Sequence, residues 1–309
     1  MTTAVIGVTG QLGTDLLKIL SGNIAPISHS DMELTDSDSI KACLDRIRPR
    51  IVINTAAYNL VDKAEDAIDD AMAVNAVGPA RLARWCQEND AKLVHFSTDY
   101  VFGGRIGSQQ DGRTGEPADS GPAAVPPTRA PRCETDLAVP ESVYAASKFA
   151  GENLVRAICP RHFVIRTCGL YGVAATLGAG KGNFVETMLR LGRDRDELAV
   201  VNDQHCTPTA TRDLAAATAE LIETEQYGLF HATNSGATTW HDLAWEIFRQ
   251  AGITVNVRPI STEEFGARAA RPAYSVLDCQ KLEAAIGRPM PSWQDALGQY
   301  LIDRAEKAG

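Results

Sequence analysis

The chain has 309 residues, 44% hydrophobic and 22% charged, a composition that allows a large buried core and excludes disorder over the whole length. Its formal net charge of −9 argues against nucleic acid as the main partner, because phosphate backbones bind to basic surfaces. The 7 cysteines include no CxxC pair, so we expect neither a metal site nor a disulfide framework, and a cytoplasmic location fits. No run reaches about 18 apolar residues, so we expect no membrane association.

Short apolar runs alternate with amphipathic helical stretches from the first residues onward. The helical stretches cover residues 15–20, 37–47 and 69–89. The apolar runs predict strands at 4–8, 24–28, 50–54 and 92–97, and the series continues at 162–166, 198–201 and 228–232. Strands that are apolar on both faces and alternate with helices indicate a parallel sheet covered on both sides. We therefore expect an α/β, doubly wound, Rossmann-like fold.

The pattern becomes less regular after residue 169, which predicts a smaller C-terminal substrate lobe. We expect residues 1–168 plus about 200–233 to form a dinucleotide-binding Rossmann domain, and about 169–199 plus 234–309 to form the second lobe. Residues 103–131 are rich in Gly, Pro, Ser and Thr and indicate a long exposed insert, either a functional lid or a disordered segment.

Three glycines mark a phosphate-binding turn near the N-terminus. Residues 7–13 read GVTGQLG and lie between an expected strand and an expected helix, which is the context that a dinucleotide-binding fingerprint requires. Gly7 would permit the tight turn, Gly10 the approach of the backbone to a pyrophosphate, and Gly13 the close packing of helix on strand. The N–H groups at the start of that helix would then face the phosphates.

Tyr144 and Lys148 form a candidate catalytic pair. They are four residues apart, so on a helix they share one face. Reduction of a ketone needs a proton donor beside the carbonyl oxygen, and a neighbouring ammonium group would lower the pKa of a phenol from its usual value of about 10. Thr98 follows the fourth expected strand and could hydrogen-bond the carbonyl oxygen, with Ser97 as the alternative.

Several segments together resemble the dTDP-4-dehydrorhamnose reductases, a branch of the extended short-chain dehydrogenase/reductases. The segments are GVTGQLG at 7–13, NTAAYNLVDKAE at 54–65, VNAVGPARLA at 74–83, HFSTDYVFGG at 95–104, VYAASKFAGE at 143–152, RTCGLYG at 166–172, NFVETMLRL at 183–191, VNDQHCTPTATRDLA at 201–215 and RPAYSVLD at 271–278. The resemblance runs almost end to end. It implies an enzyme of dTDP-rhamnose biosynthesis that uses NAD(P)H to reduce the 4-keto group of a nucleotide-linked deoxysugar.

The resemblance also implies roles for individual residues. It assigns catalysis to Thr98, Tyr144 and Lys148. It assigns cofactor binding to the glycine turn, the adenine side, the loop after the third strand and the candidate catalytic pair, with Gly7, Gly10, Gln11, Leu12, Gly13, Glu33, Leu34, Ala56, Ala57, Tyr58, Tyr144 and Lys148. It assigns the sugar nucleotide to Asp99, Tyr100 and Arg166, and the second lobe's side of the cleft to Asp203 and Gln204, which could instead form a structural corner.

Three departures from the family pattern affect the expected substrate and metal. Gly169 stands where the family usually has Trp, and the insert at 103–131 is longer than usual, so substrate choice could differ. Some members dimerise through magnesium held by acidic residues near the first helix. Thr14 and Asp15 replace that pattern, so we expect no metal, while a homodimer stays open.

The residues after the second expected strand do not decide between NADPH and NADH as the cofactor. His29 stands where many relatives have Arg, which would favour a 2′-phosphate, and Asp31 is slightly late for a carboxylate that holds the ribose. Either NADPH or NADH is therefore expected. Two other functions fit the same motifs: a nucleotide-sugar epimerase or dehydratase, and a non-catalytic regulatory subunit similar to that of methionine adenosyltransferase.

Overall fold

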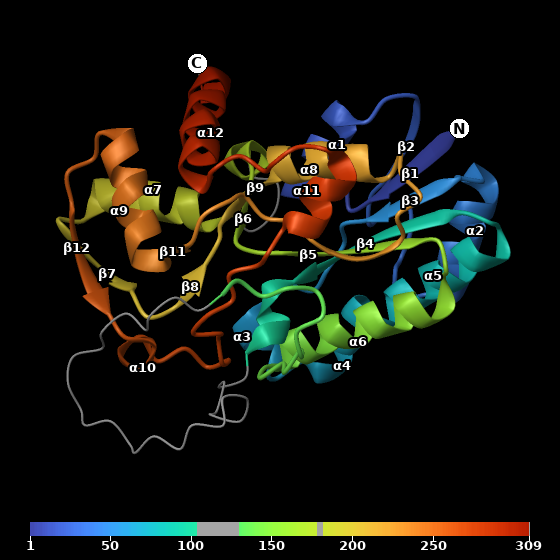
Figure 1. The fold of residues 1–309 in the computed structure, drawn as a ribbon, viewed down its shortest axis with the longest axis horizontal. Coiled ribbons are helices and arrows are strands. Elements are labelled where there is room, and N and C mark those ends of the chain that lie inside the picture. Colours follow the sequence, from blue (N-terminus) through green and yellow to red (C-terminus); the bar gives the residue numbers. More distant parts are fainter. Residues whose placement is uncertain (104–129, 178–181, 309) are drawn as a thin grey trace.

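A parallel sheet forms the centre of the computed structural model, which describes residues 1–103, 130–177 and 182–308. Within those residues the sheet has six strands in the order β2-β1-β3-β4-β5-β10 (Figure 1). The strands are β1 (Thr2–Ile6), β2 (Asn23–Ile27), β3 (Ile51–Asn54), β4 (Lys92–Thr98), β5 (His162–Thr167) and β10 (Gly228–His231). Every neighbouring pair is parallel, as the alternation of strands and helices predicts.

Helices cover both faces of this sheet, and each face has its own apolar core. One core joins the sheet to α2 (Ser37–Ile47), α5 (Gly78–Glu88) and α6 (Val143–Ile158). The other joins it to α1 (Gln11–Ile19), α8 (Thr211–Leu221) and α11 (Gln280–Ile286). Figure 1 shows the two groups on opposite sides of the strands. The expected doubly wound, Rossmann-like fold is confirmed.

A smaller lobe packs around a third core. It contains α7 (Phe184–Asp194), α9 (Trp240–Ala251), α12 (Trp293–Ala308), and the parallel pair of β7 (Glu197–Val201) and β12 (Asn256–Ile260). The prediction that residues 198–201 extend the main sheet is wrong. Alternate residues of β7 are exposed, so this strand is covered on one face only, which an apolar run by itself does not reveal. The proposed division of the chain into two domains stays a prediction.

Short elements complete the described structure. Two small two-stranded sheets pair β6 (Leu170–Tyr171) with β9 (Thr209–Ala210), and β8 (His205–Cys206) with β11 (Thr238–Thr239). Helical turns occupy connections at α3 (Val61–Ala64), η2 (Asp99–Phe102), η3 (Val173–Leu177) and α10 (Thr262–Phe265). The insert interpreted from residues 103–131 falls almost entirely outside the described residues. In the part of the chain that is described, no helix combines the length and apolarity of a bilayer span.

The helix expected at 69–89 is interrupted. The structure has α4 (Ile68–Met72), then one π-helical turn over Ala73–Val77, then α5. The π turn aims the side chain of Asn75 inward, where it accepts from the N–H of Tyr58 at 2.9 Å and donates to Ser147 Oγ at 3.0 Å. The turn therefore ties the loop after β3 to helix α6, which carries the candidate catalytic pair.

Candidate active site

A cavity of about 350 Å³ opens where the central strands end, between the two lobes. Its described walls come from the start of α1, the loop after β3, the ends of β4 and β5, helix α6 and the start of α9. This is the edge of a parallel sheet at which ligands of open α/β folds bind, because several loops converge there. The cavity is therefore the candidate active site.

The glycine turn forms one end of this cavity. Gly7 has a φ of +83°, and a Cβ on it would lie 2.7 Å from Thr55 Oγ1. A Cβ on Gly13 would lie 2.4 Å from the carbonyl oxygen of Gly7, so only glycine allows this approach of helix to strand. Gly10 precedes the first residue of α1, Gln11, and no side chain caps the helix. The N–H groups at the start of α1 are thus available to phosphate oxygens.

The candidate catalytic pair, Tyr144 and Lys148, lies on the first two turns of α6. Ser142 starts this helix by accepting a hydrogen bond from the N–H of Ala145 at 3.2 Å, which places Tyr144 in the first turn and Lys148 in the second. The Lys148 ammonium is buried and donates to the carbonyl oxygen of Phe96 at 2.6 Å. Both residues line the cavity, as their spacing predicts.

Burial is the largest influence on the pKa values of both side chains. Burial lowers the pKa of Lys148 to about 8, although nearby Glu152 favours the charged form. Burial also raises the pKa of Tyr144 to about 12, although a hydrogen bond with Thr98 acts in the opposite direction. We expected the ammonium group to bring the pKa of the phenol below its usual value, whereas in this structure burial raises that pKa.

Residues at the end of β4 and just after it contact the phenol of Tyr144. Thr98 Oγ1 accepts from the N–H of Tyr100 at 3.2 Å and lies 3.2 Å from Asp99 Oδ1. The ring of Tyr100 meets that of Tyr144 edge-on, with centroids 5.9 Å apart. Asp99 is buried, which raises its pKa to about 6, and it accepts a 2.5 Å hydrogen bond from Ser275 in the connection between α10 and α11. Asp99 therefore links the end of β4 to that connection.

Two buried hydroxyls in the cavity wall indicate a polar ligand. Ser97 Oγ and Thr167 Oγ1 are buried and have no hydrogen-bond partner among the described residues. A buried hydroxyl without a partner is costly, so such groups are usually matched by a ligand or by water. Together with the uncapped start of α1 and the close approach at Gly13, they fit a bound dinucleotide and a hydroxylated substrate.

The structure brings half of the predicted site residues into this one cavity. Its described walls include Gly10, Gln11, Leu12, Ala57, Thr98, Asp99, Tyr100, Tyr144 and Lys148. Other predicted cofactor residues lie outside it. Leu34 is buried in the core below α5, Glu33 accepts from Thr35, Ala56 packs against the same core, and the backbone of Tyr58 is held by Asn75. Their contact with a cofactor stays a prediction.

Arg166 does not reach the cavity. Its side chain is 2% exposed and forms two hydrogen bonds, of 2.9 and 2.7 Å, with the carboxylate of Glu152. The ring of Phe102 lies 5.0 Å from the guanidinium carbon, and His231 Nε2 accepts at 3.4 Å. Glu152 of α6 is therefore the partner of Arg166 in this structure, and the expected contact of Arg166 with the sugar nucleotide stays a prediction.

Asp203 and Gln204 also lie outside the described walls of the cavity. Asp203 Oδ2 accepts from the N–H of Thr262 at 2.9 Å, and Gln204 donates to the hydroxyl of Thr262 at 3.0 Å. Both side chains hold the start of α10, which supports the structural corner that we left open from the sequence. In contrast, sequence reasoning missed Ser275 and Asn75 as supports of the catalytic segment. Both residues fall inside the family-like segments, which was the available signal.

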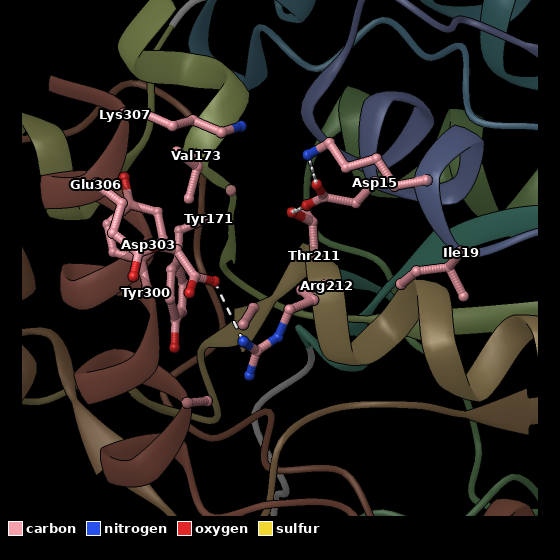
Figure 2. A pocket seen from close by; sticks show the side chains of 14 residues that line it. Asp15, Ile19, Tyr171, Val173, Thr211, Arg212, Tyr300, Asp303, Glu306 and Lys307 are labelled. Atoms are coloured by element: carbon pink, nitrogen blue, oxygen red, sulfur yellow. Dashed lines mark hydrogen bonds and ion pairs between the residues drawn. The ribbon is translucent and has the colours of Figure 1, made fainter. Parts of the chain in front are cut away.

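A second cavity, of about 330 Å³, lies between α1, α8 and α12 (Figure 2). Asp15 accepts hydrogen bonds there from Lys18 and Thr211, each at 2.5 Å, and Arg212 pairs with Asp303 at 3.1 Å. None of the predicted site residues is among its described walls. The charged groups of this second cavity are largely paired with one another. The cavity at the ends of the central strands is therefore the better candidate for the active site.

Comparison with known proteins places the chain among nucleotide-sugar enzymes. Residues 1–305 match the RmlD substrate binding domain. A dTDP-4-dehydrorhamnose reductase of Streptomyces griseus is 36% identical, and the match covers 99% of this chain and 94% of that protein. The structure of a dTDP-4-dehydrorhamnose reductase from Clostridium acetobutylicum has a TM-score of 0.86 and 38% identity, covering 99% of this chain and all of the other. The NADP complex of the Bacillus anthracis enzyme has a TM-score of 0.85 and 36% identity, with coverage of 98% and 99%. The resemblance drawn from the motifs is confirmed, and the chain belongs to the RmlD substrate binding domain family.

Proposed function

We propose that the chain reduces the 4-keto group of a nucleotide-linked deoxysugar, in the manner of the dTDP-4-dehydrorhamnose reductases that it resembles, with NADPH or NADH as the reductant. The observation that carries this function is the convergence of Thr98, Tyr144 and Lys148 with the glycine turn on one cavity. A proton donor and a dinucleotide-binding turn that face the same space are what ketone reduction requires.

The residues present fit a nicotinamide dinucleotide. Gly10, Gln11 and Leu12 would hold its pyrophosphate at the start of α1, and Lys148 its ribose hydroxyls. Asp31 accepts from the N–H of Ser28 at 2.8 Å and from its hydroxyl at 2.5 Å, so this carboxylate is already engaged and less available to a ribose 2′-hydroxyl. That arrangement and the NADP complex of the Bacillus anthracis relative support acceptance of NADPH.

The protein's own part in the reaction is to orient the carbonyl and to donate a proton. When bound, the dinucleotide supplies the hydride that reduces the carbonyl carbon. Thr98 hydrogen-bonds the carbonyl oxygen, and Tyr144 transfers its phenolic proton to that oxygen as the alcohol forms. Because the pKa of Tyr144 is about 12, the phenol is protonated at neutral pH and ready to donate. The Lys148 ammonium then stabilises the phenolate that is left.

The pKa of Lys148 predicts how the reaction depends on pH. Burial lowers this pKa from its ordinary value to about 8, so the side chain is charged below that pH and neutral above it. We expect kcat/KM for reduction to be level on the acidic side and to fall about tenfold per pH unit once the ammonium is lost. Initial rates between pH 6 and about 10 would measure this limb. Lys148→Arg stays charged and should lose the limb, whereas an unchanged profile in that variant would contradict the assignment.

The function itself is tested with purified protein, NADPH or NADH, and a panel of dTDP- and UDP-linked 4-keto-6-deoxysugars. We expect one reduced cofactor to be consumed for each keto-sugar converted. Conversion of the sugar without net consumption would instead indicate an epimerase or dehydratase. Absence of any conversion, together with binding to a methionine adenosyltransferase, would support the regulatory alternative.

A further inference from the structure

Trp240 brings an aromatic ring from the second lobe to the active-site cavity. It is the first residue of α9, and Thr239 fixes that start by accepting a hydrogen bond from the N–H of Asp242 at 3.1 Å. Trp240 lies in the same cavity wall as Thr98 and Tyr144, which belong to the central-sheet domain. Among the described residues of that wall, it is the aromatic side chain that the second lobe contributes.

The ring is fixed from two sides. Its centroid lies 4.9 Å from that of Phe184, with the two planes 50° apart. On the other side, the backbone at Gly169 comes so close that a Cβ there would lie 3.2 Å from Trp240 Cη2 and 3.3 Å from Pro208 Cα. Gly169 also has a φ of +52°, a backbone conformation that disfavours other residues. A side chain at 169 would therefore press on the Trp240 ring, which packs against the backbone just after β5.

We propose that Trp240 is the specificity-determining wall on which the apolar face of the keto-sugar rests, and that Gly169 leaves the space which sets its position. The inference rests on the proposed function and deepens it. The proton donor Tyr144 and the orienting hydroxyl of Thr98 both belong to the central-sheet domain, so the reacting carbonyl lies between them and the second lobe. An indole face packs well on C–H groups, and the methyl group of a 6-deoxysugar adds apolar surface for that contact.

Substitutions at Trp240 separate contact with the sugar from a general structural role. Trp240→Ala should lower kcat/KM for the keto-sugar about tenfold, mainly through KM, while Trp240→Phe recovers most of the loss. The dissociation constant of NADPH should change less than about twofold, because the glycine turn is untouched. Trp245→Ala is the matched control, since this second tryptophan of α9 is 54% exposed and lies outside the described walls of the cavity.

Gly169→Ala tests the spatial link between the two positions. A methyl group at 169 should displace the ring and raise KM for the keto-sugar in the same direction as Trp240→Ala. In the double variant Gly169→Ala/Trp240→Ala the two effects should be far from additive, because both act through one ring. Additive effects would show that Gly169 acts through something other than the ring, and would overturn the proposed link.

The outcomes distinguish this inference from the proposed function. If the wild-type protein reduces a keto-sugar and Trp240→Ala keeps its KM, the wall assignment is overturned and the function stands. If Trp240→Ala weakens NADPH binding as much as it raises KM, the ring serves the cofactor, and the assignment to the sugar is again overturned. If the wild-type protein oxidises neither reduced cofactor with any keto-sugar of the panel, both proposals fall together.

Discussion

Tyr144→Phe is expected to lower turnover about 10²- to 10⁴-fold, the range of rate that general acid catalysis contributes. Only the phenolic hydroxyl is lost, so the substituted ring keeps its edge-on packing against Tyr100. Turnover falls because this hydroxyl is the proton source, and its pKa of about 12 keeps it protonated at any pH used for assay. Affinity for NADPH should remain, because the glycine turn does not contact the missing atom.

Steady-state oxidation of NADPH measures the turnover of this variant, and fluorescence titration measures its cofactor affinity. Tyr227→Phe is a suitable control, since it removes another phenol whose oxygen accepts from Arg161 at 3.2 Å, outside the described walls of the cavity. That control should turn over like the wild-type protein. Turnover near the wild-type rate in Tyr144→Phe would mean that the proton comes from another group, and buried Asp99, with a pKa of about 6, would be the first to examine.

The core of the fold was predictable because its strands, apart from the edge strand β2, are buried on both faces. Such strands appear as short apolar runs, and the glycine turn after the first run adds a constraint that few other folds impose. That Tyr144 and Lys148 share one helix face was predictable for a similar reason, because a four-residue spacing has a fixed meaning once the segment is helical. The sequence pattern was therefore sufficient to predict elements whose contacts are close in sequence or repeat along the chain.

The features that the sequence did not predict come from contacts that join distant parts of the chain. Residues 198–201 are as apolar as a central strand, yet they pair with β12, more than fifty residues later. The π turn at Ala73–Val77 depends on Asn75 reaching Tyr58 and Ser147, which no helical periodicity encodes. Asp203 lies in a family-like segment, but its carboxylate holds Thr262 and not a ligand of the cavity.

Arg166 is the most consequential of these cases, because the resemblance assigned it to the sugar nucleotide. Its partner Glu152 lies on α6, the helix that precedes β5, and is 0% exposed. The sequence pattern does not reveal that these two side chains form an ion pair. Burial lowers the pKa of the neighbouring His231 to about 3, and the charge of Arg166 acts in the same direction. The imidazole is therefore neutral and can accept from the guanidinium at 3.4 Å.

Arg166→Ala is expected to reduce the free energy of unfolding by about 3–5 kcal/mol, because Glu152 would be left as a buried charge without a partner. Denaturant titration followed by circular dichroism measures the change. The double variant Glu152→Met/Arg166→Met removes both charges and keeps much of the volume, so it should recover most of the loss. Below its unfolding transition, this variant should also keep the wild-type KM for the keto-sugar, because neither side chain lines the described cavity. A KM raised in the double variant in spite of restored stability would return Arg166 to the substrate, as the resemblance alone had suggested.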